Sequence, residues 1–278
     1  MMLERFTARI TAGLIAMAVV FLFIWISITG AEAREVHVVV GFDHDSRPFS
    51  FSDNGKATGL YPAIVREVFN RIHQPVSLKA YPWRRVLAGL ETGQLAAGGI
   101  YRTAERDQVF AFSRPFHSDA ILLFVPTERP KNNKFTLSDL TGMTIGAIQG
   151  WSYGDRFDHL RQQGLFRVEE VRNDASNLRK LQAGKLDAFL AVEIAGWNLL
   201  AETDNLDSVR SIRPPVAVNN VHLAFSNGDP NVQLLPAINQ AIADMAEDGT
   251  LEDIFDRYID PSYRAHMPEA LSPPAALN

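Results

Sequence analysis

Two turns in this sequence carry residues that suit the recognition of an anion. The first turn, from Thr103 to Arg106, follows a short apolar segment that ends at Ile100. Arg106 presents a planar fork of N–H donors that matches a carboxylate in a bidentate pair, and its guanidinium stays charged in proteins. The second turn holds Ser152, where an apolar segment gives way to a helical pattern. Because backbone N–H groups at the start of a helix bind anions, this second turn also suits an anion.

The second turn also fits a different chemistry. The segment from Gly150 to Gly154 spells G-x-S-x-G between a predicted strand and a predicted helix, as in the nucleophile elbow of serine hydrolases. Asp187 and His222 follow it in the Ser-Asp-His order, although the sequence has no HGG-type segment for an oxyanion hole. A serine hydrolase is therefore an alternative, and it predicts an esterase activity that Ser152→Ala abolishes.

The elements that must position these turns alternate between apolar segments of strand length and helical patterns. This order is typical of an α/β fold in which helices cover a mostly parallel sheet. A polar break from Thr127 to Lys134 separates two such blocks of about a hundred residues each, which suits two domains. Residues 43–48 read as a polar loop. Strands are expected at 36–42, 76–80, 95–100, 109–113, 120–125, 143–148, 167–171, 186–192 and 216–225, and helices at 62–72, 83–92, 153–163, 175–183, 195–201, 232–248 and 251–258.

The N-terminal residues have the pattern of a secretory signal peptide. Arg5 and Arg9 precede an uncharged run from Ile10 to Thr29, and Ala31-Glu32-Ala33 supplies a small-x-small cleavage site. We therefore expect a signal peptide over residues 1–33. The run is also long enough for an uncleaved membrane anchor, since about 20 residues span a bilayer. Either outcome places the remainder outside the cytoplasm, in the periplasm.

The composition excludes several classes of function. The net charge of −5 gives no basic footprint for nucleic acid. The absence of cysteine from the sequence excludes disulfides, cysteine nucleophiles, Cys-type zinc sites and a lipoprotein anchor. The cluster Asp43-His44-Asp45 reads as a solvated loop, because no paired-histidine spacing accompanies it. We expect neither a metal nor a cofactor.

An ordered set of short motifs resembles the family 3 extracellular solute-binding proteins, the polar-amino-acid binders that serve ABC transporters. Residues 98–106 read GGIYRTAER and residues 109–116 read VFAFSRPF, which is similar to the central signature of that family. The other motifs follow in the same order and together extend the match over about residues 36–260. They are PFSF at 48–51, GL at 59–60, LETG at 90–93, DLTG at 139–142, a glycine at 150, GKLDA at 184–188 and DGT at 248–250.

The resemblance implies a two-lobed type II periplasmic-binding fold. Lobe one would comprise residues 36–124 and 222–260, lobe two residues 125–221, and the C-terminal tail residues 261–278. Two extended crossings, near Phe124 and near Val221, would form the hinge on which the lobes close. The implied function is capture of a small carboxylate, in the first place an amino acid, for an inner-membrane ABC permease. A monomer without enzymatic activity is expected.

The resemblance also assigns the binding residues. Arg106 would hold the α-carboxylate of the ligand, and the turn at Trp151 and Ser152 would close on it from lobe two. Trp83 matches an aromatic residue that packs over the ligand. Further ligand contacts are implied for Asp43, Gly99 and Tyr101.

The sequence departs from the family where an α-ammonium would be recognised. The acid that clasps the ammonium should fall near Val192, but the nearest carboxylate is Glu193. A slip of one residue in a strand reverses the direction in which a side chain points. Either Glu193 reaches the ligand from the following turn, or the ligand is a plain carboxylate. The usual acids are also missing from Leu60–Ala63 and at Ala96.

Two further alternatives share the same fold. An exported lyase could use Glu193 or Asp43 as a general acid, if burial raised the pKa of that carboxyl. A pair of binding lobes could also report to a membrane signalling partner in place of a permease. The sequence does not separate these partners, because lobe closure exposes similar surfaces to either.

Overall fold

The computed structural model of the protein describes residues 37–129 and 135–259. Within these ranges, twelve strands join into one sheet that is covered by helices. The predicted signal peptide and the predicted tail, 261–278, lie outside the described residues. Among the helices of the described ranges, none combines the length and the apolar character that a membrane span requires.

Lobe one, as we name the first half of the sheet, is built around strand β1 (Val38–Asp43). This strand pairs in parallel with β5 (Val76–Tyr81) on one side and with β6 (Ala96–Tyr101) on the other. Helices α2 (Leu60–Arg71) and α3 (Trp83–Glu91) connect these strands. The predicted β-α-β-α-β order is confirmed, because short runs of apolar, β-branched residues form the buried strands of a parallel sheet.

A small hairpin follows β1 where the sequence was read as a polar loop. Strands β2 (Asp45–Ser46), β3 (Ser50–Asp53) and β4 (Lys56–Thr58) pair in antiparallel order, and β4 continues onto β5. The prediction of a loop over residues 43–48 is therefore wrong for Asp43, which ends β1, and for Asp45 and Ser46. Backbone pairing and the burial of Phe49, which is 1% exposed, hold the hairpin in spite of its polar composition.

Lobe two repeats the pattern with a second set of parallel strands. Strand β9 (Thr144–Ile148) lies between β10 (Arg167–Val171) and β11 (Ala188–Val192). The 3-10 helix η2 (Leu137–Leu140) precedes β9. The helices of this lobe are α4 (Asp155–Gln162), α5 (Asp174–Gln182) and α6 (Glu193–Glu202).

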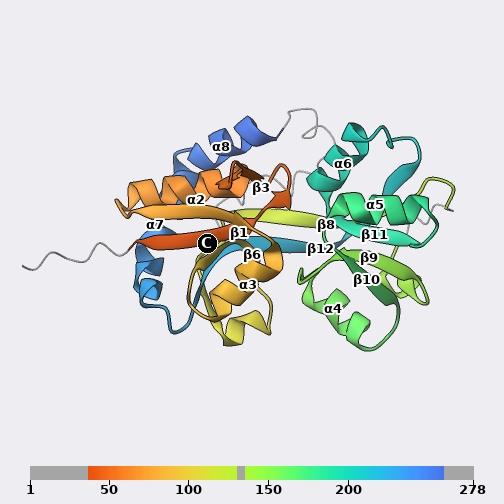
Figure 1. Cartoon of the computed structure of the whole chain (residues 1–278), viewed down its shortest axis with the longest axis horizontal. Coiled ribbons are helices and arrows are strands. Elements are labelled where there is room, and N and C mark those ends of the chain that lie inside the picture. The colour runs from red at the N-terminus through yellow and green to blue at the C-terminus, as the bar shows by residue number, and fades with distance from the viewer. Residues whose placement is uncertain (1–36, 130–134, 260–278) are drawn as a thin grey trace, which may run out of the picture. The chain divides into compact units, whose positions relative to one another are not determined.

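Two long strands, β8 (His117–Pro126) and β12 (Val209–Ser226), connect the two lobes and run side by side in opposite directions (Figure 1). Residues 121–124 of β8 pair with β11 of lobe two, and residues 221–224 of β12 pair with β6 of lobe one. The strand order is therefore β10-β9-β11-β8-β12-β6-β1-β5-β4-β3-β2. The short strand β7 (Phe110–Phe112) pairs with the end of β12.

The predicted hinge crossings near Phe124 and Val221 fall on these two strands. Phe124 pairs with Phe189 of β11, so β8 has already joined the sheet of lobe two before residue 124. The crossing on β8 therefore lies a few residues earlier than the sequence indicates. The lobe boundaries themselves, 36–124 with 222–260 and 125–221, stay a prediction.

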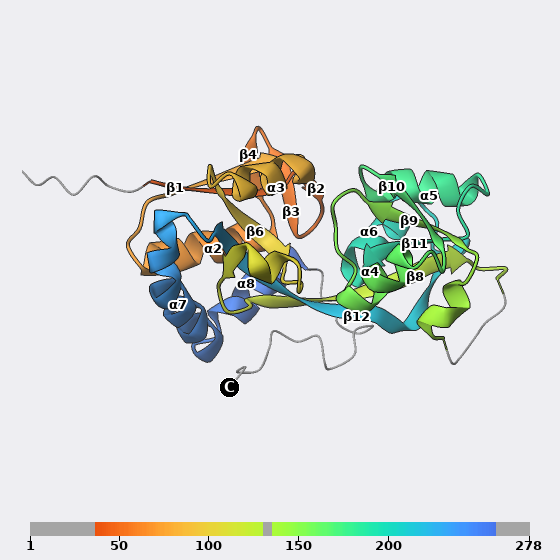
Figure 2. The same cartoon turned by 90° about the horizontal axis from the view of Figure 1, so that it is seen from below.

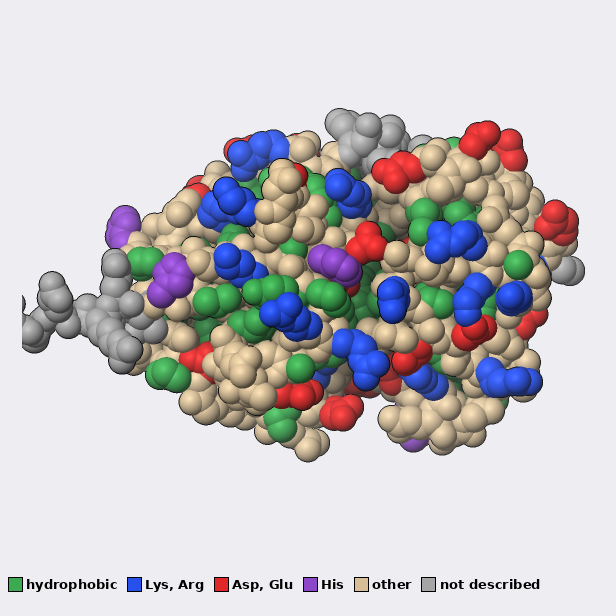
Figure 3. All heavy atoms as spheres, in the orientation of Figure 1, with side chains coloured by type: hydrophobic (Ala, Val, Ile, Leu, Met, Phe, Trp, Pro, Cys, Tyr) green, Lys and Arg blue, Asp and Glu red, His purple; other side chains and the backbone are tan. Residues whose placement is uncertain are grey.

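The C-terminal helices return to lobe one. The 3-10 helix η3 (Pro230–Leu234), α7 (Leu235–Glu247) and α8 (Thr250–Tyr258) follow β12, and α7 and α8 pack against α2 (Figure 2). On the face shown in Figure 3, Lys and Arg side chains lie among Asp and Glu side chains.

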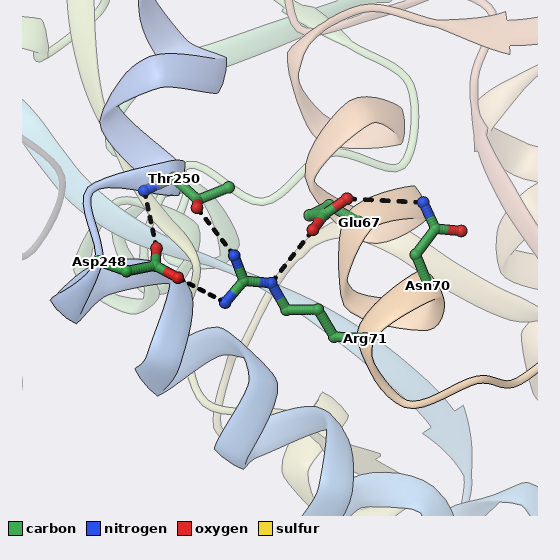
Figure 4. Close-up of polar contacts among 5 residues, drawn as sticks. All are labelled: Glu67, Asn70, Arg71, Asp248 and Thr250. Carbon is green, nitrogen blue, oxygen red and sulfur yellow. Dashed lines mark hydrogen bonds and ion pairs between the residues drawn. The ribbon is translucent and has the colours of Figure 1, made fainter.

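Arg71 joins the end of α2 to the turn between α7 and α8 (Figure 4). Its guanidinium donates to Asp248 Oδ2 and to Thr250 Oγ1, both at 2.8 Å, and to Glu67 Oε1 at 3.1 Å. Hydrogen bonds from Thr250 and Arg71 lower the pKa of Asp248 to about 2. This surface network fixes the C-terminal helices on lobe one.

Candidate functional site

A pocket lies where the two lobes meet. The carboxyl ends of β1 and β6 supply one wall, and the turn after β9 supplies the other. The lining residues are Asp43, Ser46, Phe49, Ser50, Tyr61, Trp83, Gly98, Gly99, Tyr101, Arg106, Trp151 and Ser152.

Arg106 lies half-buried at the junction of the lobes, as the first residue of the 3-10 helix η1 (Arg106–Gln108). Its Nη1 donates to the carbonyl oxygen of Tyr101 at 2.9 Å, and its Nη2 donates to that of Gly150 at 3.1 Å. Burial lowers the pKa of Arg106, but a guanidinium keeps its charge at neutral pH. The side chain therefore places a positive charge at the cavity wall and aims it across to lobe two.

Two tryptophan side chains also make contacts from one lobe to the other. Trp83 Nε1 donates to the carbonyl oxygen of Gly150 at 3.1 Å, so this oxygen accepts from two groups of lobe one. Trp151 Nε1 lies 3.4 Å from Asp43 Oδ2. Burial raises the pKa of Asp43, while hydrogen bonds from His44, Asp45 and Trp151 oppose that rise. These contacts hold the turn of lobe two against the cavity.

Ser152 lies at the cavity, but its hydroxyl already makes hydrogen bonds within lobe two. Its Oγ donates to Asp158 Oδ2 at 2.6 Å and accepts from the backbone N–H of Gly154 at 3.3 Å. Burial raises the pKa of Asp158, and the hydrogen bond from Ser152 lowers it. The helix predicted from Tyr153 begins at Asp155, so Ser152 belongs to the turn that precedes α4.

The residues of the possible hydrolase triad are not brought together. The hydroxyl of Ser152 contacts Asp158. His222 Nδ1 contacts the carbonyl oxygen of Ser113 at 2.7 Å, within lobe one. Asp187 Oδ2 accepts from the backbone N–H of Thr144 at 2.7 Å, at the start of β9. Each member thus has a separate structural contact, and neither His222 nor Asp187 is joined to the serine.

Glu193 does not reach the cavity. It is the first residue of α6, is 2% exposed and forms an ion pair with Arg213 of β12. Burial raises the pKa of Glu193, and the charge of Arg213 lowers it. Glu193 is therefore not among the residues that line the cavity, and its contact with a ligand stays a prediction. The other residues predicted for the site line the cavity together, and their contact with a ligand stays a prediction.

Sequence reasoning missed several residues of the cavity. Ser46, Phe49 and Ser50 come from the hairpin that was read in part as a loop. Tyr61 occupies the α2 segment where the sequence departs from the family pattern, and its ring packs against Gly99. Behind the cavity wall lies Asp119, buried on β8. The available signal for Asp119 was a carboxylate directly before an apolar run that is predicted as a strand.

The comparison with protein families decides the classification. The model of the bacterial extracellular solute-binding proteins, family 3, matches residues 38–261. This chain belongs to that family. The two-lobed type II periplasmic-binding fold and the solute-binding role that the sequence motifs implied are thereby confirmed at the level of the family.

Relatives within the family are binding proteins for amino acids. The L-cystine-binding protein TcyJ of Escherichia coli (strain K12) is 29% identical over 226 residues, which cover 80% of this chain and 82% of TcyJ. The L-cystine-binding protein TcyA of Bacillus subtilis (strain 168) is 24% identical over 235 residues, with 80% of each chain covered.

Solved structures share the fold. A histidine kinase sensor domain with similarity to periplasmic binding proteins superposes with a TM-score of 0.72 at 22% identity and covers 82% of this chain and 98% of its own. An ancestral arginine-binding protein bound to arginine gives a TM-score of 0.68 at 22% identity, with 80% and 97% covered.

One acid at the meeting of the lobes makes stability depend on pH. Asp174 begins α5, and its neighbour Asn173 donates from Nδ2 to Asp45 Oδ2 at 2.7 Å across the lobes. Burial raises the pKa of Asp174 to about 7, and the carboxylates of Asp43 and Asp45 add to the rise. Because this pKa exceeds the unfolded value of about 3.9, the stabilisation is complete below about pH 4 and is lost as the pH rises through 7.

We therefore expect Asp174→Asn to stabilise the protein at high pH only. At pH 8 the variant should gain about 1 to 3 kcal/mol, since the ionised carboxylate is removed. That gain corresponds to about 2 to 4 °C in melting temperature per kcal/mol for a chain of this size. Melting curves of wild type and variant from pH 4 to 8 measure the difference. Asp155→Asn, at the exposed first residue of α4, is the matched control. An equal gain at pH 4 and pH 8 would show that the charge of Asp174 is not its cause.

Proposed function

We propose that this protein captures a small carboxylate, above all an amino acid, in the cavity between its lobes. The observation that carries the proposal is the position of Arg106, whose Nη2 lies 3.1 Å from the carbonyl oxygen of Gly150 on the opposite lobe. A ligand carboxylate in the cavity would take the place of that oxygen as acceptor. It would then meet a bidentate, charge-assisted donor at the junction that closes around it.

In this proposal, the two lobes capture the ligand by closing around it. β8 and β12 are the connections between the lobes in the sheet, whereas Arg106, Trp83 and Trp151 make side-chain contacts across the cavity. A ligand that touches both walls favours the closed state by its differential affinity for it. We propose that the chain is exported to the periplasm and delivers its ligand to an inner-membrane ABC permease. The names of the cystine-binding relatives support an amino acid as the cargo.

A thermal-shift screen tests this function. The panel contains the L-amino acids including L-cystine, the corresponding keto acids and small dicarboxylates. A ligand at 100 times its Kd should stabilise the protein by about 2.7 kcal/mol, which is a rise of about 5 to 11 °C. The same preparations are assayed for turnover of a chromogenic ester. A panel without any stabilising carboxylate, or ester hydrolysis lost in Ser152→Ala, would contradict the proposal.

A further inference from the structure

A buried carboxylate holds two of the tyrosines that line the cavity. The hydroxyl of Tyr61, from α2, donates to Asp119 Oδ2 at 2.5 Å, and the hydroxyl of Tyr101, from β6, donates to the same oxygen at 2.6 Å. The exposed fractions are 5% for Tyr61, 7% for Tyr101 and 2% for Asp119. Three elements thus converge on one oxygen directly behind the cavity wall.

The second oxygen of this carboxylate faces a buried histidine. Asp119 Oδ1 is buried and makes no hydrogen bond among the described residues. Its neighbour is His117 Nε2, at 3.3 Å. The ring of His117 is itself buried against Phe49, Tyr61 and Phe255. A carboxylate so placed presents a negative field that the apolar surroundings do not screen.

The direction of the two hydrogen bonds determines what the tyrosines can offer a ligand. A phenol has a single proton, and Tyr61 and Tyr101 both donate that proton to Asp119. Burial and the charge of Asp119 raise the pKa of both phenols well above its usual value, so both keep the proton. With its proton donated to Asp119, each hydroxyl oxygen keeps only acceptor capacity for any further partner. These hydroxyls suit a donor such as an ammonium and do not suit a carboxylate.

The acceptors lie beside the predicted carboxylate position. Tyr101 contacts Arg106 through its backbone carbonyl and Asp119 through its side chain, so one residue connects the two charged groups. Gly99 has φ +80°, and an added Cβ there would lie 2.7 Å from Cδ2 of Tyr61. The glycine thus lets the Tyr61 ring close against β6. An arginine on the wall, and a buried carboxylate behind the two tyrosines of the same wall, match the opposite charges of an α-amino acid.

We infer that Tyr61 and Tyr101, oriented by Asp119, form an ammonium-acceptor subsite on lobe one. The subsite takes the role that the apolar Val192 and the ion-paired Glu193 leave unfilled on lobe two. The inference rests on the proposed capture of a carboxylate at Arg106 and narrows its ligand to an α-amino acid. Asp119 acts here through the two tyrosines and is a positioning residue.

Matched pairs of probes test the subsite by titration calorimetry. Each pair is an amino acid and the same acid without its amine: L-cystine with 3,3′-dithiodipropionate, L-glutamine with glutaramate, and L-phenylalanine with 3-phenylpropanoate. Wild type should bind the amino acid of its preferred pair at least about 100-fold more tightly, because each hydrogen bond to a charged group contributes about a tenfold or larger factor. Tyr61→Phe and Tyr101→Phe should each weaken binding of the amino acid about tenfold or more and leave the amine-free acid unchanged.

The variants are chosen so that folding does not decide the outcome. Tyr→Phe removes only the hydroxyl, and Tyr81→Phe, outside the cavity lining, is the matched control that should bind as wild type does. Asp119→Asn should abolish the preference for the amine, and its circular dichroism spectrum reports whether it folds. If carboxylates bind but the amine adds nothing, or if Tyr→Phe weakens both probes equally, the subsite is refuted while the proposed function stands. If no carboxylate binds to wild type, both are refuted.

Discussion

Replacement of Arg106 by alanine is expected to weaken ligand binding by about 100-fold or more and to remove the thermal shift that the ligand produces. Two hydrogen bonds to a charged group are lost, each worth about 1.5 to 3 kcal/mol. The negative charge of the ligand would also remain at the lobe junction without a partner. Titration calorimetry of wild type and variant, with the carboxylate that gives the largest thermal shift, measures the loss.

Two further variants separate the geometry of Arg106 from its charge. Arg106→Lys keeps the charge but cannot form a bidentate pair, so its affinity should fall between those of wild type and Arg106→Ala. Arg102→Ala is the matched control, because its side chain is 54% exposed and pairs with Asp107 at 2.7 Å away from the cavity lining. An Arg106→Ala variant that retains the wild-type shift would refute the assignment of the carboxylate position.

The apolar elements were predictable because their patterns are local. β5 was expected at 76–80 and runs from Val76 to Tyr81, and α3 was expected at 83–92 and runs from Trp83 to Glu91. In each case a short run of apolar residues, or an apolar stripe at helical spacing, determines which face is buried. The first part of β12, from Val209, was missed, since it contains two prolines and its buried and exposed positions follow no regular alternation.

The hairpin after β1 shows where local patterns fail. Residues 45–58 are mostly polar, and their strands form because the hairpin pairs with β5 and buries Phe49 between lobe-one elements. Such stabilisation depends on partners that are distant in sequence. The same reason hides Asp119, whose role depends on α2, β6 and β8 meeting behind the cavity.

The residues of the candidate site also divide into those that local sequence features predicted and those that depend on the three-dimensional arrangement. Arg106 and Ser152 were found from chemistry and motif, and the structure brings both to the cavity. Glu193 was considered because it is the nearest acid to the expected position, but the start of α6 directs it to Arg213. A one-residue offset cannot be resolved from sequence, because the end of β11 determines which side chain faces the cavity. The acceptor for a ligand amine therefore had to be sought in the structure.

Gly196→Ala is expected to destabilise lobe two strongly. Gly196 lies on the buried face of α6, and an added Cβ would lie 2.2 Å from Cζ and 2.4 Å from Cε2 of Phe124. Phe124 cannot easily move, since its ring stacks on Phe189 at 5.2 Å and meets Trp197 edge-on at 6.1 Å. Overpacking of this kind costs about 1 to 3 kcal/mol and sometimes more, and the gain of about 1 kcal/mol from alanine in a helix offsets only part of it.

The melting temperature of Gly196→Ala should therefore fall by about 2 to 4 °C for each kcal/mol of net loss. Gly228→Ala is the matched control, because nothing lies within 4 Å of an added Cβ at that position. The double variant Gly196→Ala with Phe124→Leu should recover part of the loss, since the smaller side chain removes the ring atoms that clash. If the two glycine variants melt at the same temperature, α6 does not pack against Phe124 as closely as this structure shows. Recovery in the double variant would instead locate the cost at that contact, because an independent pair of substitutions would add their losses.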